Sequence, residues 1–291
     1  MVCEGEINQG GEAMKNKHFF KFLGLLLTVS MLVFAAPAQA EMYVEAYLGG
    51  VQGANAGMDV SNSIQRPPNE FVQHVAGQLD PAVIGGLKIG TWFVKEGFLG
   101  YNYPDWMKYF GFYLDFSYHR LNFTRQTGST TYNVRPERSN TMHNVFWSEG
   151  NAATLAFMFA GRYGFLPDSE VPFGRLQPYL AVGPAILFAS QTPAFNLYDI
   201  RNTTPLIDVI KPASQSGAFI CLAVEAGIRW MALKNVSIDL SFKYRYAAPS
   251  FTYNYYDMGY GDAAYAGGFR SVTLDPTMHL FSGQLGAAYH F

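Results

Sequence analysis

Eight segments of the sequence alternate between apolar and polar residues, the pattern of a β-strand with one face in an apolar environment. In the clearest, Val236 to Tyr246, every second residue is Val, Ile, Leu, Phe or Tyr, and the residues between them are Ser, Asp, Lys or Arg. The segments cover 41–50, 82–93, 109–123, 151–163, 176–189, 218–232, 236–246 and 278–291. Each is long enough to cross a bilayer as a tilted strand, which takes about 9–11 residues.

The connections between these segments alternate in length. Those after the odd-numbered segments have 27 to 31 residues (51–81, 124–150, 190–217 and 247–277), and those after the even-numbered segments have 3 to 15 (94–108, 164–175 and 233–235). A transmembrane barrel that starts in the periplasm requires this order, because its odd connections lie outside the cell. A soluble sandwich does not sort its loops in this way. The sequence therefore predicts an all-β, antiparallel, up-and-down transmembrane β-barrel of eight strands, with long extracellular loops and short periplasmic turns.

Aromatic residues make up 16% of the chain and charged residues only 14%, yet no run of about 18 apolar residues suits a membrane helix beyond the N-terminal region. The aromatic residues gather near segment ends, which predicts two interfacial girdles. The expected periplasmic girdle contains Trp92, Phe93, Tyr109, Phe110, Tyr163, Phe165, Trp230, Tyr289 and Phe291, and the outer girdle contains Phe123, Phe188, Phe219, Tyr246 and Phe281. The general preference of aromatic residues for strands explains their number but not this placement.

The N-terminal region predicts export. Residues 14–40 combine three lysines, an apolar stretch too short to span a bilayer and the small-residue site Ala38-Gln39-Ala40, as in a cleavable signal peptide. An uncleaved anchor helix is the alternative. Residues 1–13 contain three glutamates and are interpreted as a spurious extension, so the barrel domain is 41–291 and begins at Glu41. Removing 1–40 leaves the net charge at −2, which gives no reason to expect a nucleic-acid partner.

The topology, the Ala38 to Ala40 site and the alternating end at Phe291 resemble small Gram-negative outer-membrane β-barrels of the outer-membrane protein A transmembrane-domain type, within the broader outer-membrane β-barrel domain family. The resemblance implies that Tyr289 and Phe291 belong to a signal read by the barrel-assembly machinery. It also implies a monomer in the bacterial outer membrane, surrounded by lipid and lipopolysaccharide. We expect no periplasmic C-terminal domain after Phe291. The cell-wall tethering role of such a domain is therefore not expected here.

If the apolar faces meet lipid, the opposite faces meet in a lumen just wide enough for side chains to fill. The inward set is Glu45, Lys88, Asp115, His119, Arg162, Gln177, Glu225, Arg229, Asp239, Lys243, Arg245 and Gln284. Buried charges are costly unless paired, so their near balance predicts an ion-pair network with some water. We expect Glu225 and Arg229 to bond to neighbours on the third and seventh segments.

Three functions fit such a barrel. The main hypothesis is a structural or surface-interaction role with a lumen filled by side chains, and the alternative is a narrow, porin-like pore gated by exchange of ion pairs. The distant alternative is a lipid-modifying enzyme, for which Asp115, Ser117 and His119 share one strand face. Residues two apart on a strand are about 7 Å apart, too far for a nucleophile to hydrogen-bond its base. We therefore predict no enzyme activity and no catalytic residues.

No cofactor or metal is expected. His74, His143, His279 and His290 have no ligand spacing, and Cys221 is the only cysteine after the signal. The glycines from Gly85 to Gly90 lie within a strand segment and open no helix, so they are expected to relieve crowding rather than to hold phosphate.

Two features fit the eight-strand interpretation poorly. Pro178 and Pro184 interrupt the fifth segment, which requires bulges or a shorter strand, because proline removes a donor from the ladder. The long connections also contain strand-like stretches such as 251–256, expected as hairpins beyond the membrane, although ten strands remain an alternative. Rich in Tyr, Asn, Gly and Ser, these loops suit contact with a host, a phage or lipopolysaccharide.

Overall fold

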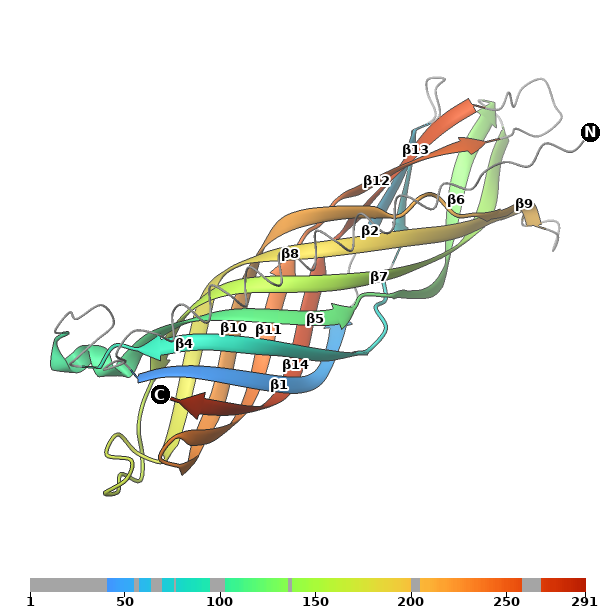
Figure 1. Ribbon diagram of the computed structural model, residues 1–291. Coiled ribbons are helices and arrows are strands. Elements are labelled where there is room, and N and C mark those ends of the chain that lie inside the picture. The colour runs from blue at the N-terminus through green and yellow to red at the C-terminus, as the bar shows by residue number, and fades with distance from the viewer. Residues whose placement is uncertain are drawn as a thin grey trace, which may run out of the picture.

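The computed structural model describes residues 41–54, 58–63, 70–75, 77–94, 103–135, 138–199, 205–257 and 268–291. These residues form an elongated barrel of long, tilted strands (Figure 1). The described part of the chain contains one short helix, the 3-10 turn η2 (Asp105–Tyr109), and no helix there is long and apolar enough to cross a membrane. The all-β class predicted from the alternating segments is confirmed.

Eight antiparallel strands close the barrel in the order β7-β5-β4-β1-β14-β11-β10-β8, and β8 pairs back onto β7. They are β1 (Glu41–Ala54), β4 (Ala82–Trp92), β5 (Phe110–Arg120), β7 (Arg138–Arg162), β8 (Leu176–Asp199), β10 (Gln215–Leu233), β11 (Val236–Ala247) and β14 (Met278–His290). Each predicted segment corresponds to one of them. The predicted count of eight is confirmed, and the ten-strand alternative is wrong.

The barrel closes where the last strand meets the first. β14 pairs with β1 from Tyr43 opposite His290 to Ala54 opposite His279. The Phe291 N–H donates to the Met42 carbonyl oxygen at 2.9 Å, so the terminal residue is tied to the first strand. Each of the eight barrel strands is paired on both sides, which satisfies most of its backbone groups, as lipid requires.

The other strands belong to the four long connections. β6 (Phe123–Arg135) pairs with β7, and β9 (Pro205–Ile210) pairs with β8. A separate four-stranded sheet has the order β12-β13-β2-β3, with β12 (Phe251–Asp257), β13 (Gly268–Pro276), β2 (Met58–Ser63) and β3 (Glu70–Val75). The strand-like stretch 251–256 is therefore part of a hairpin beyond the barrel, as expected.

The opposite end has short turns. β10 and β11 are joined by two residues, and η2 lies between β4 and β5. In the turn between β7 and β8 the Asp168 carboxylate accepts the N–H groups of Glu170 and Val171 and pairs with Arg175. The Val171 N–H and the Arg175 guanidinium hold the pKa of Asp168 below its ordinary value.

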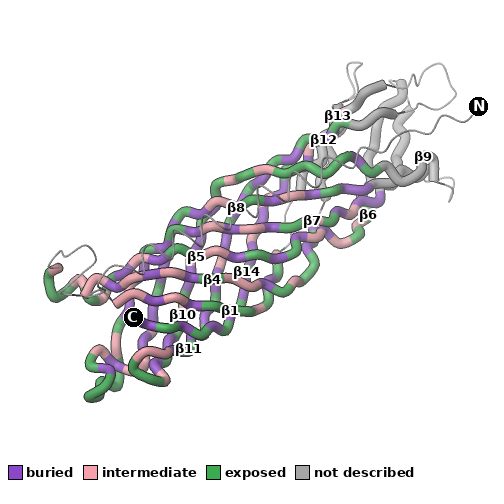
Figure 2. The backbone as a smooth tube through the Cα atoms, viewed as in Figure 1, coloured by how far each residue is buried: buried purple, intermediate pink, exposed green. Residues whose placement is uncertain are grey.

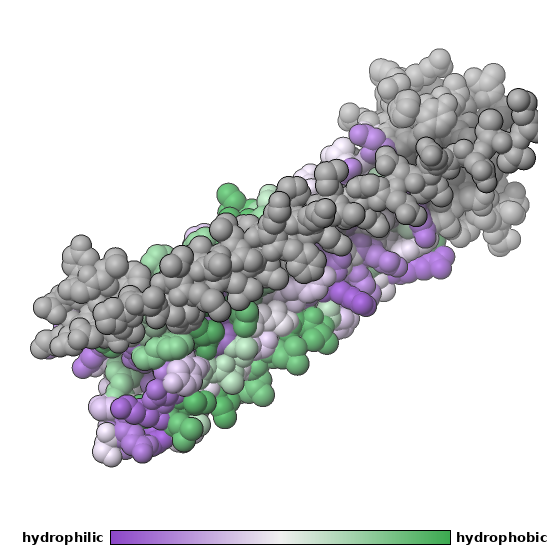
Figure 3. Space-filling model, in the orientation of Figure 1, coloured by the Kyte–Doolittle hydropathy of each residue, from purple (hydrophilic) through white to green (hydrophobic). Residues whose placement is uncertain are grey.

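Burial alternates along the described parts of the barrel strands (Figure 2), and the exterior is the apolar side. Ile220 is 87% exposed and Leu240 62%, whereas the charged residues of the same strands are buried. Apolar side chains gather on the exposed face of the barrel (Figure 3). A soluble protein would bury this surface, so the medium around the wall is lipid.

The predicted aromatic girdles are partly wrong. Phe110, Tyr163, Trp230 and Tyr289, with Phe188 and Tyr246 near the other end, are exposed as expected. Trp92 and Phe123 are almost fully buried instead, because they lie on the inward-facing side of their strands.

The two prolines do not shorten or shift β8. Pro178 lies opposite Ile228 and Pro184 opposite Leu222, in a register with β10 that shows no bulge. On the other side, the bridges to β7 are missing opposite Gly183 and Pro184 and resume in the same register. The cost of the missing proline donor is thus a local gap in one ladder, and the bulge or shortening predicted from the sequence is wrong.

Candidate functional site in the charged lumen

All twelve residues assigned to the lumen from the sequence lie inside the barrel, and none is more than 4% exposed. Every one of the eight barrel strands contributes at least one of them. Seven form the lumen network, a continuous set of ion pairs: Glu45, Lys88, Asp115, Glu225, Arg229, Asp239 and Lys243.

Two lysines join opposite walls of the barrel, and both contact Glu225. Lys88 Nζ lies 2.7 Å from Glu225 Oε1 and 2.7 Å from Glu45 Oε1. Lys243 Nζ lies 3.0 Å from Glu225 Oε2 and also pairs with Asp115. Because β4 and β10 are four strands apart around the barrel, as are β5 and β11, the pairs from Lys88 to Glu225 and from Lys243 to Asp115 cross the lumen.

Arg229 extends the network toward the periplasmic end. Its Nη2 donates to Glu45 Oε2 at 2.7 Å, and its Nε donates to Asp239 Oδ2 at 3.3 Å. The guanidinium carbon lies 4.3 Å from the centre of the Tyr43 ring, within cation–π range. The Tyr179 hydroxyl lies 2.7 Å from both Glu225 Oε1 and Asp239 Oδ1, so one donor serves two carboxylates.

Inward tyrosines fill the space between the charges, and inward glycines make room for them. The Tyr47 hydroxyl donates to Asp115 Oδ1 at 2.6 Å. A Cβ at Gly86 would lie 2.4 Å from the Tyr47 hydroxyl oxygen, and one at Gly227 would lie 2.6 Å from the Tyr179 ring. Within the Gly85 to Gly90 run, crowding is relieved at Gly86 and at Gly90, where a Cβ would lie 2.7 Å from the Tyr43 ring, but not at Gly85, where a Cβ would meet nothing closer than 3.6 Å.

Arg162 forms a second site near the periplasmic end. Its guanidinium makes two hydrogen bonds to the Glu41 carboxylate, one of them at 2.7 Å, and Nη1 also donates to Gln177 Oε1 at 3.0 Å. It lies between Trp92 and Phe173, with its central carbon 4.1 Å from each ring centre. A planar cation held by a carboxylate and two rings is well fixed.

Arg245 lies on the extracellular side of the network. Its Nη1 donates to Ser117 Oγ at 3.0 Å and to Thr154 Oγ1 at 3.2 Å, and it pairs with no carboxylate among the described residues. His119 Nδ1 lies 2.8 Å from the backbone oxygen of Arg120. No hydrogen bond joins Asp115, Ser117 and His119, whose side chains all lie in the described part of the chain.

An apolar layer closes the barrel toward the cell exterior. Phe219 and Phe251 meet edge to face with their ring centres 5.2 Å apart, and Phe123 and Phe146 do so at 6.3 Å. Tyr253 is fully buried, and its hydroxyl donates to the Gln191 carbonyl oxygen at 3.3 Å. The interior is thus filled at two levels, by charges in the wall-to-wall network and by rings above it.

One predicted contact is wrong. Glu225 and Arg229 were expected to bond to the third and seventh segments, and the seventh, β11, does supply Lys243 and Asp239. Their other ion-pair partners come from β1 and β4 rather than from the third segment, β5. Which strand supplies the partner depends on how far neighbouring strands are offset along the barrel axis, and the alternation of residue types does not reveal this offset.

Sequence reasoning also missed several members of the site. Tyr43, Tyr47 and Tyr179 share the inward parity of neighbouring charged residues, and Glu41 shares that of Glu45. The alternation of each segment could have identified them, because every second residue of a strand faces the lumen.

No cluster of His, Cys, Asp or Glu among the described residues could hold a metal. The His279 ring pairs with the Tyr244 hydroxyl at 2.8 Å, and His290 Nε2 lies 2.8 Å from Ser237 Oγ. The side chains of His74 and His143, and the proposed cleavage site at Ala38 and Ala40, lie outside the described residues. Tyr289 and Phe291 meet edge to face at 5.0 Å, and their role in assembly stays a prediction.

No protein-family model matches the sequence, and no curated protein matches it. Among solved structures, the chain is similar to Neisserial surface protein A at 10% identity, with 87% of this chain and 100% of that chain covered and a TM-score of 0.37. The outer membrane protein OprG from Pseudomonas aeruginosa gives 12% identity, 87% and 96% coverage and 0.41. A major outer membrane protein from Thermus thermophilus gives 12% identity, 87% and 100% coverage and 0.42.

These similarities are low, and the strand pairing itself establishes the architecture. A closed wall leaves no sheet edge, its outer surface is apolar, and its charges face inward. These features give the chain the architecture of a small outer-membrane β-barrel.

Proposed function

We propose that this protein is a closed outer-membrane barrel with a structural or surface-interaction role in the cell envelope. The observation that carries the proposal is the filling of the lumen at two levels. Lys88 and Lys243 connect opposite walls within the network, and Phe219 and Phe251 pack in the apolar layer above it. Eight-stranded barrels leave an interior just wide enough for such filling.

The extracellular end supports the surface-interaction part of the proposal. β6 and β9 extend the wall beyond the membrane, and the sheet of β12, β13, β2 and β3 adds a second ordered surface there. Long extracellular connections built on a rigid scaffold are the usual carriers of recognition. The eight strands that close the wall leave no edge within the membrane for pairing with a second copy, and we propose a monomer.

Planar-bilayer conductance tests the closed lumen. The refolded wild type, Glu225→Ala and Arg229→Ala should all give no current above background, because each substitution leaves the apolar layer intact. Proper insertion is verified by the heat-dependent gel mobility of folded barrels. Discrete openings of the wild-type protein would refute the proposal.

A narrow pore is the second candidate, and one observation favours it. Lys88 and Lys243 each contact two carboxylates and share Glu225, so a lysine has an alternative partner if one contact opens. This candidate requires wild-type current that changes in size or gating in Glu225→Ala.

We propose no catalytic role. Asp115 is engaged by Tyr47 and Lys243, and Ser117 by Arg245, so neither is available to His119. Lipid A mass profiles should be identical with and without expression of the protein. A new acylated or deacylated species on expression would refute this statement.

A further inference from the structure

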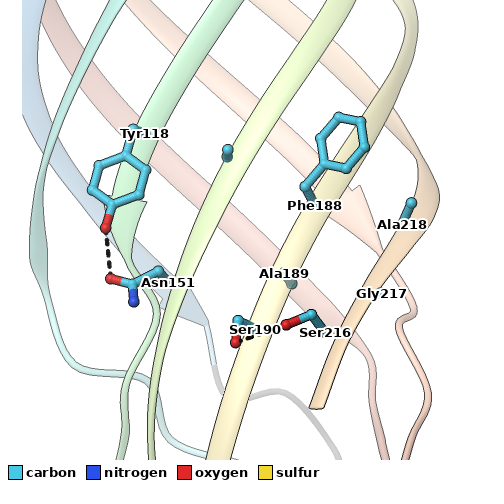
Figure 4. Close-up of a pocket in the computed structure, with 9 residues that line it drawn as sticks. Tyr118, Asn151, Phe188, Ala189, Ser190, Ser216, Gly217 and Ala218 are labelled. Carbon is cyan, nitrogen blue, oxygen red and sulfur yellow. Dashed lines mark hydrogen bonds between the residues drawn. The ribbon is translucent and has the colours of Figure 1, made fainter. Parts of the chain in front are cut away.

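A groove runs along the lipid-facing side of β5, β7, β8 and β10, at the extracellular ends of β5 and β10 and near the middle of the longer strands β7 and β8 (Figure 4). Strand pairing aligns Tyr118, Ala153, Phe188 and Ala218 in one outward row across these four strands. Because alanine alternates with a large ring along the row, gaps are left beside the rings. The resulting groove has a volume of about 460 Å³.

The next row toward the cell exterior is polar. The Tyr118 hydroxyl donates to Asn151 Oδ1 at 2.8 Å, and Ser190 Oγ lies 3.1 Å from Ser216 Oγ. Arg120 lies directly opposite Asn151 on the same outward face, and its exposed side chain pairs with no carboxylate among the described residues. The outward carboxylate Glu149 lies one row further out, opposite Thr192.

The row on the membrane side is wholly apolar. Phe116, Leu155, Ile186 and Ile220 are aligned there. The groove therefore crosses from the apolar band to a polar rim that carries one cation. Since the long connections on this side are extracellular, this boundary is the interface of the outer leaflet.

The chemistry of the groove selects an amphiphile with an acyl chain and a phosphate. The alanine gaps suit a chain lying against Tyr118 and Phe188, the serine hydroxyls suit a sugar or phosphate oxygen, and a guanidinium binds phosphate through paired N–H groups. We propose that this groove binds one acyl chain and one phosphate of lipid A in the outer leaflet. The closed lumen is not needed for this binding.

Native mass spectrometry of the full barrel in detergent, titrated with hexa-acylated lipid A, tests the site. Ala153→Phe with Ala218→Phe fills the gaps, and Ala287→Phe places the same ring at an outward position on β14. Because the acyl chain leaves detergent rather than water, its affinity for the groove comes from packing against the rings, and losing about ten such atom contacts is roughly a tenfold loss. Filling the groove should thus weaken lipid A binding at least about tenfold, while Ala287→Phe leaves it unchanged.

Arg120→Gln tests the contact with the phosphate separately from the contact with the acyl chain. It should lower affinity for lipid A by about tenfold, the usual effect of one charge-assisted contact, and leave affinity for dephosphorylated lipid A unchanged. Lys234→Gln, at an exposed turn on the periplasmic side, is the matched control and should behave as wild type.

Three results would overturn the proposal. They are equal binding by the groove-filled variant and the wild type, equal loss in Ala287→Phe, and equal displacement of lipid A by phosphatidylglycerol. Folding of each variant is verified by gel mobility. Bilayer conductance is a separate readout, so failure here is distinguishable from failure of the closed-lumen proposal.

Discussion

Replacing Lys88 by methionine tests whether the lumen network is held by charge pairing. The side chain is 1% exposed, and its Nζ lies 2.7 Å from both Glu45 and Glu225. Methionine has a similar length and fills the same space without the charge. The network then changes from three cations and four carboxylates to two cations and four carboxylates.

The size of the effect follows from what remains paired. Two opposite charges 2.7 Å apart attract by about 6 kcal/mol at an effective dielectric constant of 20, before the cost of removing them from water. Removing one partner of a buried pair costs about 3–5 kcal/mol. Glu45 keeps Arg229 and Glu225 keeps Lys243, so we expect the lower end, about 3 kcal/mol, in the free energy of unfolding.

Removing a carboxylate should cost less. Glu225→Gln leaves three cations facing three carboxylates and keeps an oxygen that can accept from Tyr179. We expect a loss of about 1 kcal/mol. The double variant Lys88→Met with Glu225→Gln should lose about 1–2 kcal/mol less than the sum of the two single losses, because the two residues are in contact.

Urea unfolding in phosphatidylcholine vesicles, followed by tryptophan fluorescence, measures these differences. Lys234→Met is the control, since Lys234 is exposed in the turn between β10 and β11. A Lys88→Met barrel within about 1 kcal/mol of the wild type would refute the reasoning. Simple additivity in the double variant would also refute it.

Three further outcomes are expected. Gly86→Val should destabilise the barrel by about 2 kcal/mol in the same assay because its Cβ meets the Phe116 carbonyl oxygen and the Tyr47 ring, whereas Gly283→Val, whose Cβ meets nothing within 4 Å, should be neutral. Arg162→Lys should cost about 1–2 kcal/mol, since lysine keeps a charge near Glu41 but loses the paired hydrogen bonds and the stacking, and equal stability would contradict this. Phe291→Ala should reduce the amount of barrel assembled in cells while leaving refolding in detergent intact; unchanged outer-membrane levels would exclude the assembly role.

The sequence was sufficient to predict the wall and the direction of its side chains. Period-two alternation sets which face each residue occupies. A two-residue turn joins β10 and β11, and the register shifts by one residue between Met231 and Leu233. With this shift Glu225 lies opposite Lys243 and Arg229 opposite Asp239, whereas the turn alone would set Glu225 opposite Tyr244. Because alternation requires inward residues to face inward residues, the need for this shift follows from the sequence, and pairs within one hairpin are accessible to sequence reasoning.

Pairs across the lumen are not accessible in the same way. Lys88 and Glu225 belong to strands four apart around the barrel, so their meeting depends on how far each strand is staggered along the axis, a property that accumulates around the whole closed sheet. A different stagger would keep both residues inward and give each another partner. In so narrow a barrel Lys88 and Lys243 reach carboxylates on the opposite wall. Alternation identified the members of the network because it sets which residues face the lumen, while the stagger chose β4 over β5 as the partner of Glu225.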